Sequence, residues 1–190
     1  MTSVPEAPGA PAVILYRQVD RDDNSRTGNE YNYVRIKILT EEGRKHANVE
    51  IPYFRADSTI SSVRARTVRP DGTIANFEGK AYDKTIAKLK GVKYLAKTFT
   101  LPDVQVGSII EYHYTYNLAE NKVYDSDWLL SDELFTRHAK FSLRPYTNFA
   151  LRWSWPIGLP AGTAPPKQEA ATKIVRMESQ NIPAFQAQWI

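Results

Sequence analysis

The sequence predicts an all-β fold, an antiparallel β-sandwich of roughly ten strands with at most one short helix. Short runs of β-branched and aromatic residues recur along the chain at intervals of about 8–12 residues. Turn signals that contain Gly, Pro, Asp or Asn separate these runs, and a helical period is almost absent. The chain has 190 residues, 42% of them hydrophobic, which is enough to build the core of one such sandwich.

We expect one folded domain over residues 13–186. Residues 1–12 read as a Pro/Ala-rich extended leader that lacks the basic and apolar regions of a signal peptide, and residues 187–190 as the start of a linker to a further domain. No apolar run approaches the ~20 residues that are needed to cross a bilayer. We therefore expect no membrane span.

Five strands are expected in the first half of the chain. The clearest is the second, in which Val34, Ile36 and Ile38 alternate with polar residues, so that one face of the strand is apolar. Pro52 confines the third strand to an edge or a bulge, and the turn at residues 69–73 joins the last two strands because it places Pro and Gly where a tight turn needs them. The expected strands lie at residues 12–21, 30–40, 47–54, 60–68 and 73–77.

The second half of the chain continues this pattern with one exception. Residues 82–91 space their apolar side chains by threes, which predicts a short helix, although Gly91 weakens it. Residues 119–134 are polar around Trp128 and predict a long connection or a single helical turn. The further strands are expected at residues 93–102, 109–118, 137–146, 147–156 and 171–185.

The strand at residues 109–118 carries an aromatic face. Alternation places Ile110, Tyr112, Tyr114 and Tyr116 on one side of it. Each buried aromatic ring removes roughly 150–250 Å² from water, so such a face stabilises a core whether or not it touches a ligand. We therefore expect the tyrosines to be one face of a sheet, and we keep Tyr112 and Tyr114 as candidates for a ligand-binding or interdomain surface.

Three tryptophans are further candidates for a binding surface. Trp153 and Trp155 share one face of their expected strand and could form a stacking platform for sugars or peptides, which Trp128 could extend. Phe149 and Leu151 lie on the same face of that strand. Four large apolar side chains in a row would form a costly exposed patch. We therefore favour burial of this face in the core and keep the platform as the alternative.

Motifs for catalysis, metals and nucleotides are absent or incomplete. The chain has no cysteine, no zinc or glycine-rich phosphate motif and no nucleophile elbow. Asp20, Asp22 and Asn24 follow the order of a calcium loop, but its sixth and twelfth positions hold Ser and Tyr instead of Gly and Glu, which favours a polar turn. Glu111 and His113 share a strand face and could form an acid–base couple, although a surface pair is the favoured interpretation. We expect no cofactor and no metal.

The positive charge of the chain is local. Residues 80–97 hold six lysines against one aspartate, whereas the formal net charge of the whole chain is +4. Around these lysines only Tyr82 and Tyr94 could stack on bases, and the arginines and recognisable module of a nucleic-acid site are missing. We therefore expect a solvated lysine-rich surface and no nucleic-acid partner.

Four landmarks occur along the chain in order. They are a T-E-x-G turn at residues 40–43, a P-D-G hairpin at residues 70–72, the block F-x-L-P-x-V-x-x-G-S-I-I-E-Y at residues 99–112 and the sequence I-P-A at residues 182–184. Together they resemble the bacterial domain of unknown function that lies immediately N-terminal to transglutaminase-like cores, in proteins usually exported to the periplasm or cell surface. The block at residues 99–112 is the most specific of the four.

The resemblance implies a double-layered all-β module that is not itself an enzyme. It places any Cys nucleophile, with its His and Asp, downstream of Ile190 in a transglutaminase-like domain of the same polypeptide, which would be the partner of this module. It also implies a periplasmic or extracellular location and a scaffold role for the tyrosines. Two hypotheses stay open beside it: a stand-alone glycan- or peptide-binding module, and an enzyme that uses Glu111 and His113.

Overall fold

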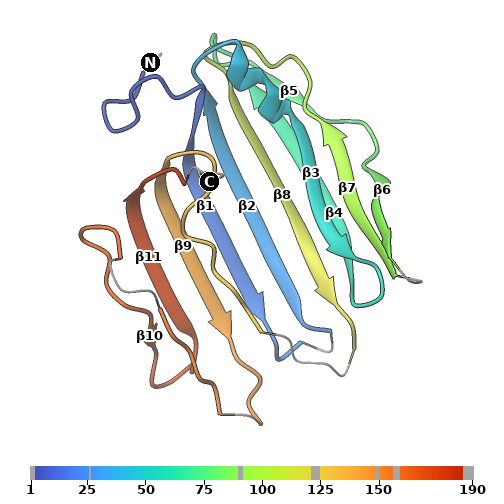
Figure 1. Cartoon of the computed structure of the whole chain (residues 1–190), viewed down its shortest axis with the longest axis vertical. Helices are drawn as coiled ribbons and strands as arrows, with labels where there is room; N and C mark the ends of the chain where they lie inside the picture. Colours follow the sequence, from blue (N-terminus) through green and yellow to red (C-terminus); the bar gives the residue numbers. More distant parts are fainter. Residues whose placement is uncertain are drawn as a thin grey trace.

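The computed structural model describes residues 3–25, 27–89, 92–120, 125–148, 150–155 and 159–185. In this part of the chain eleven strands form two sheets, and six residues form one 3-10 helix, η1 (Figure 1). The elements are β1 Ala12–Asp22, β2 Asn29–Ile38, η1 Glu42–Ala47, β3 Asn48–Phe54, β4 Ser58–Val68, β5 Ile74–Asn76, β6 Tyr82–Leu89, β7 Val92–Thr100, β8 Ile109–Leu118, β9 Thr136–Arg144, β10 Lys167–Gln168 and β11 Val175–Ile182. The predicted all-β, sandwich-like fold is confirmed.

The larger sheet has eight strands in the order β10-β11-β9-β1-β2-β8-β4-β5, and the smaller sheet has three in the order β3-β7-β6. Every pair of neighbouring strands is antiparallel except β1 and β9, which are parallel. The sequence predicts antiparallel pairing throughout, and this one pair departs from it. The first strand of the chain therefore lies in the middle of the large sheet, between the second and the ninth (Figure 1).

The main core lies where the small sheet packs on the large one. Ile36 and Ile110 contribute to it from the large sheet, and Val49, Leu95 and Phe99 from the small sheet. Burial of such side chains stabilises the fold by roughly 1.5–3 kcal/mol each. The three tyrosines of β8 pack against the same cluster, which confirms that they form one face of the sheet.

A second, smaller core covers the other end of the large sheet. Val19, Phe141 and Met177 belong to it, from β1, β9 and β11 respectively. No residue of the small sheet is among its members in the described chain. Instead, Trp128 and Leu159, which lie in irregular segments, pack against it. At this end the second layer is therefore made of loops.

The helix expected at residues 82–91 is wrong. Residues 82–89 form β6, which pairs with β7, and residues 90 and 91 lie outside the described part of the chain. The register shifts between Thr85 and Ala87, so Ile86 is the extra residue of a bulge, and its side chain is exposed. The spacing by threes is not that of a helical face: it combines this bulge with the pairing of Leu89, the last residue of β6, with Val92, the first residue of β7.

Two smaller differences concern the start of the chain. The T-E-x-G turn at residues 40–43 runs into the helix η1, in which a Cβ on Gly43 would lie 2.1 Å from the carbonyl oxygen of Pro11. Glycine is therefore needed there for close approach of two backbones and not for a positive φ. In the expected leader, Val4 is buried against Val13, Leu39 and Phe135. No helix in the described residues has the length and apolar character of a membrane span.

Candidate functional site

An apolar pocket of about 380 Å³ lies over the loop-covered end of the large sheet. Side chains of β9 and β11 contribute to its lining, among them Leu143 and Val175. Two irregular segments, residues 126–130 and 151–155, supply most of the rest. All three tryptophans singled out in the sequence line this cavity, which we call the tryptophan pocket: Trp128, Trp153 and Trp155.

Trp128 anchors the tryptophan pocket to the sheet. Its indole stacks on the ring of Phe141 in β9, with 5.4 Å between the ring centroids and 21° between the ring planes. Stacked aromatic pairs add roughly 0.5–1.5 kcal/mol to the effect of burial alone. The contact fixes one side of the pocket. The chain around Trp128 has no regular secondary structure.

Trp153 and Trp155 lie at the exposed rim of the pocket. They are 40% and 47% exposed, and residues 150–155 form no strand. The strand expected at residues 147–156 and the burial of its apolar face are therefore wrong for the described residues, while Phe149 lies outside them. The alternation of apolar residues in this segment predicts a strand wrongly, because β11 takes the place beside β9 where such a strand would pair. With no strand beside them, the indoles stay at the surface.

Two residues that line the tryptophan pocket each carry a polar atom without a hydrogen-bond partner among the described residues. These atoms are the indole Nε1 of Trp128 and the hydroxyl oxygen of Ser126, and both are buried. A buried donor without a partner costs about 1–3 kcal/mol, so groups of this kind are rare in folded proteins and mark places where water or a ligand binds. Sequence analysis missed Ser126, whose only signal is its position two residues before Trp128.

Tyr112 and Tyr114 do not join the tryptophan pocket. They lie between the two sheets, where they pack against the main core and line a separate cavity of about 220 Å³. Burial raises the pKa of Tyr112 to about 12, and it also raises the pKa of Tyr114. The five candidate residues therefore lie in two places: the two tyrosines belong to a core face, and the three tryptophans line the tryptophan pocket.

Glu111 and His113 do not contact each other as an acid–base couple. The buried carboxylate of Glu111 forms ion pairs with Arg35 and Arg66, at 2.6 and 2.5 Å. The imidazole of His113 lies against the ring of Tyr31, with 5.5 Å between centroids. Burial and the nearby Arg64 lower the pKa of His113, so it is neutral at physiological pH. Glu111 is therefore bound by arginines and His113 contacts a tyrosine ring, and the two side chains do not form a couple.

The acidic turn is a polar connection between β1 and β2. The backbone N–H of Asn24 donates to Asp22 at 2.8 Å, and the Asn24 amide donates to the carbonyl of Pro145. Asp20 instead accepts hydrogen bonds from Gln18 and Ser142. No group of three His, Cys, Asp or Glu side chains that could hold a metal ion occurs in the described residues.

The lysine-rich stretch lies on the β6–β7 hairpin of the small sheet. Lys84 pairs with Glu50 at 2.8 Å and Lys97 with Asp83 at 2.5 Å. The ion pair with Lys97 is the largest cause of the lowered pKa of the Asp83 carboxyl. Lys80, Lys84 and Lys93 are exposed, as expected for a solvated surface.

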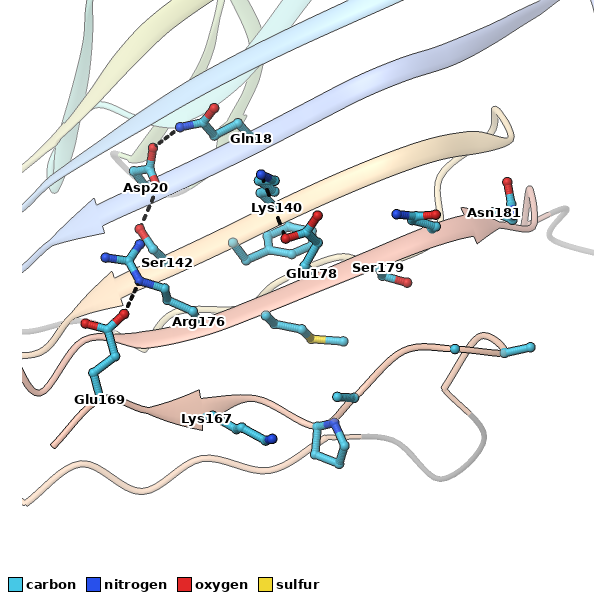
Figure 2. Close-up of a pocket in the computed structure, with 17 residues that line it drawn as sticks. Gln18, Asp20, Lys140, Ser142, Lys167, Glu169, Arg176, Glu178, Ser179 and Asn181 are labelled. Atoms are coloured by element: carbon cyan, nitrogen blue, oxygen red, sulfur yellow. Dashed lines mark hydrogen bonds and ion pairs between the residues drawn. The ribbon is translucent and has the colours of Figure 1, made fainter.

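A second, larger hollow of about 800 Å³ lies along the outer side of β11 (Figure 2). We call it the edge groove. β11 lines one side of it and the segment of residues 161–167 lines the other. It also extends over the face of the sheet, where Gln18 and Asp20 of β1 and Lys140 and Ser142 of β9 line it. Its charged side chains are mixed in sign and include the pairs Lys140–Glu178 and Arg176–Glu169. The edge groove has both polar and apolar lining, and it contains none of the three tryptophans of the tryptophan pocket.

Comparison with known proteins places these features in a family. The domain-of-unknown-function family DUF3857, which has solved structures, matches residues 24–186. A sequence comparison with curated proteins finds no match. A crystal structure from Parabacteroides distasonis ATCC 8503, described as that of a putative protease, is similar with a TM-score of 0.71 and 15% identity. The similarity covers 94% of this chain but only 37% of that protein, and it concerns the fold alone. The chain belongs to the DUF3857 family of domains.

Proposed function

We propose that this chain is a non-catalytic recognition module of a longer bacterial protein with a transglutaminase-like or cysteine-protease-like domain, exported to the periplasm or cell surface. The tryptophan pocket would hold an apolar side chain presented by that catalytic domain and so position the domain. One observation carries this proposal: an apolar cavity lined by three tryptophans lies over the loop-covered end of the large sheet.

Two further observations support this proposal. Trp153, Trp155 and Leu129 give the pocket an exposed apolar rim, and interfaces between domains of one chain are built from such patches. The separate engagement of Glu111 and His113 speaks against an acid–base couple at that position. The similar solved structure, described as a protease, is also much longer than this chain.

The test is to mix this chain with the separately expressed remainder of its natural polypeptide and to measure association by calorimetry. We expect binding that Trp153→Ala weakens at least tenfold, because hot spots at interfaces centre on such aromatic anchors. Tyr82→Ala is the matched control, since Tyr82 is an exposed aromatic residue on the small sheet, far from the pocket in the strand order. Absence of association, or equal weakening by both variants, would overturn the proposal.

A second candidate function is glycan or peptide binding by a stand-alone module. The exposure of Trp153 and Trp155 favours it, because accessible indoles can stack on sugars and extended peptides. Titration with peptidoglycan fragments and with extended peptides should then change tryptophan fluorescence, and Trp153→Ala should reduce the affinity. A silent fluorescence signal with both probes would remove this candidate.

A further inference from the structure

The outer edge of β11 is only partly paired. β11 pairs with β9 from Val175 to Ile182, but on its other side β10 pairs only with Val175 and Arg176 (Figure 1). The edge groove is lined by six consecutive residues of β11, Arg176 to Asn181, and all of them except Arg176 lie beyond the part of the edge that β10 pairs.

The prolines of the facing segment explain why β10 is so short. Lys167 pairs with Arg176, so continued pairing would place Pro165 opposite Glu178. Neither Pro165 nor Pro166 has an N–H group to donate, and the ladder therefore ends. The segment keeps its place by a side-chain bond, 2.6 Å between the hydroxyls of Thr163 and Ser179.

The backbone of β11 presents unused hydrogen-bonding groups to the edge groove. The N–H of Glu169 donates to the carbonyl of Ile174, so the backbone of Ile174 faces outward. In an antiparallel ladder alternate residues face the same side, which directs the N–H and C=O groups of Glu178 and Gln180 outward as well. Within the described chain, no residue of the facing segment forms a backbone hydrogen bond with either of them.

The other sheet edges carry features that block pairing. β3 contains Pro52, and β6 has a bulge after Thr85. β4 has a register shift and the left-handed residue Ser62, with φ 54°, in the part that β5 leaves unpaired. Proteins use prolines, bulges and irregular backbone to protect exposed edges from pairing. From Val175 to Gln180, β11 has no proline, no register shift and no positive φ.

We propose that the edge groove binds an extended peptide, which adds as a strand antiparallel to β11. One face of the added strand would meet Met177, Ala164 and Pro165, which line the groove. The other face would meet the charged side chains Lys140 and Glu178 (Figure 2). The peptide therefore has an apolar residue at every second position and polar residues between them. Backbone hydrogen bonds to Glu178 and Gln180 supply the affinity, as in other complexes formed by strand addition. This site is separate from the tryptophan pocket and does not depend on its role.

The test uses an array of ten-residue peptides that alternate Val, Ile, Leu or Phe with polar residues. The strongest binder is then measured in solution against the variant Gln180→Pro, which removes one outward N–H, and against Gln180→Ala, which keeps it. Gln180 is exposed, so neither change removes a side chain from the core. We expect Gln180→Pro to weaken binding at least tenfold and Gln180→Ala to leave it within twofold. A peptide with N-methylated alternate residues should also fail to bind.

Several results would overturn the proposal. They are an array without a bound peptide, equal affinity of the Gln180→Pro variant and the wild type, and loss of binding on Trp153→Ala, which would assign the peptide to the tryptophan pocket. Amide hydrogen exchange gives a readout that needs no variant. The N–H groups of Glu178 and Gln180 should exchange quickly in the free protein and become protected by the peptide. Protection before the peptide is added, or none after it, would count against strand addition.

Discussion

The two ends of the large sheet are built from the same kind of strand but are covered differently. Over β2 and β8 the small sheet supplies a second regular layer, and the tyrosines of β8 pack beneath it. Over β9 and β11 the cover is irregular chain, held by Trp128 on Phe141. The regular end holds cavities of about 220 and 590 Å³, and the loop-covered end holds the tryptophan pocket and the edge groove. The two ends therefore differ in how the sheet is covered and in where the tryptophans are exposed, because the larger core lies at the regular end and Trp153 and Trp155 lie at the other.

The largest effect is expected from truncation in the main core. Phe99 is 5% exposed and contacts the rings of Phe77 and Tyr112. Phe99→Ala should therefore lower the free energy of unfolding by about 4 kcal/mol, measured by urea denaturation. Tyr82→Ala, in the same sheet but exposed, should change it by less than about 0.5 kcal/mol. Similar losses for the two variants would mean that the small sheet does not carry the main core.

A smaller loss is expected at the loop-covered end. Trp128 is only partly buried, so Trp128→Ala should cost about 2 kcal/mol, roughly half the effect of Phe99→Ala. Trp128→Phe retains a ring against Phe141 and should recover most of that loss. If Trp128→Ala were as damaging as Phe99→Ala in the same urea titration, the distinction between a stabilising end and a binding end would fail.

Alkaline pH should weaken the regular end selectively. The pKa of Tyr112 is raised from 10 to about 12 in the folded protein, so its contribution to stability is complete below pH 10 and is lost as the pH rises toward 12. Between pH 9 and 11 this single group should reduce the free energy of unfolding by about 1 kcal/mol. Tyr112→Phe should lessen the pH dependence by that amount in denaturation curves. An unchanged pH profile would show that the pKa of Tyr112 is the same in the folded and unfolded states.

The smallest effect on stability is expected at the rim of the tryptophan pocket. Trp153 is 40% exposed, and Trp153→Ala should change the free energy of unfolding by no more than about 0.5 kcal/mol. Thermal unfolding should show a nearly unchanged midpoint in a variant that has lost binding. A large shift of the midpoint would identify Trp153 as a structural residue and would remove the rim from the candidate site.

The regular end was the easier one to predict from sequence. Strict alternation in β2 and β8, and the Pro-Asp-Gly turn after β4, encode local geometry that the rest of the fold does not override. The bulge at Ile86 imitates a helical spacing, because one extra residue changes the period of a strand. Residues 150–155 alternate like a strand but have no strand beside them, and which strands pair depends on long-range contacts that a local pattern does not contain.

The candidate site was predictable only in part, for the same reason. The three tryptophans were recognisable by their type, and the structure brings them together around one cavity. The unpaired hydroxyl of Ser126 and the open edge of β11 depend on which groups lack partners after folding. The Pro165–Pro166 pair was the available signal for the edge groove, since two consecutive prolines cannot continue a ladder.

The parallel pairing of β1 with β9 determines when the large sheet can be completed during synthesis of the chain. Asp20 and its partner Ser142 are 122 positions apart in the chain, whereas β2 follows β1 after a short turn. During synthesis, β1 can pair with β2 at once, but its other side stays open until β9 has left the ribosome. Closing such a long loop is slow, and an unpaired strand edge promotes aggregation in the meantime. Chains truncated before β9 should therefore aggregate and be degraded quickly, whereas a chain without β5, at the far edge of the sheet, should still fold.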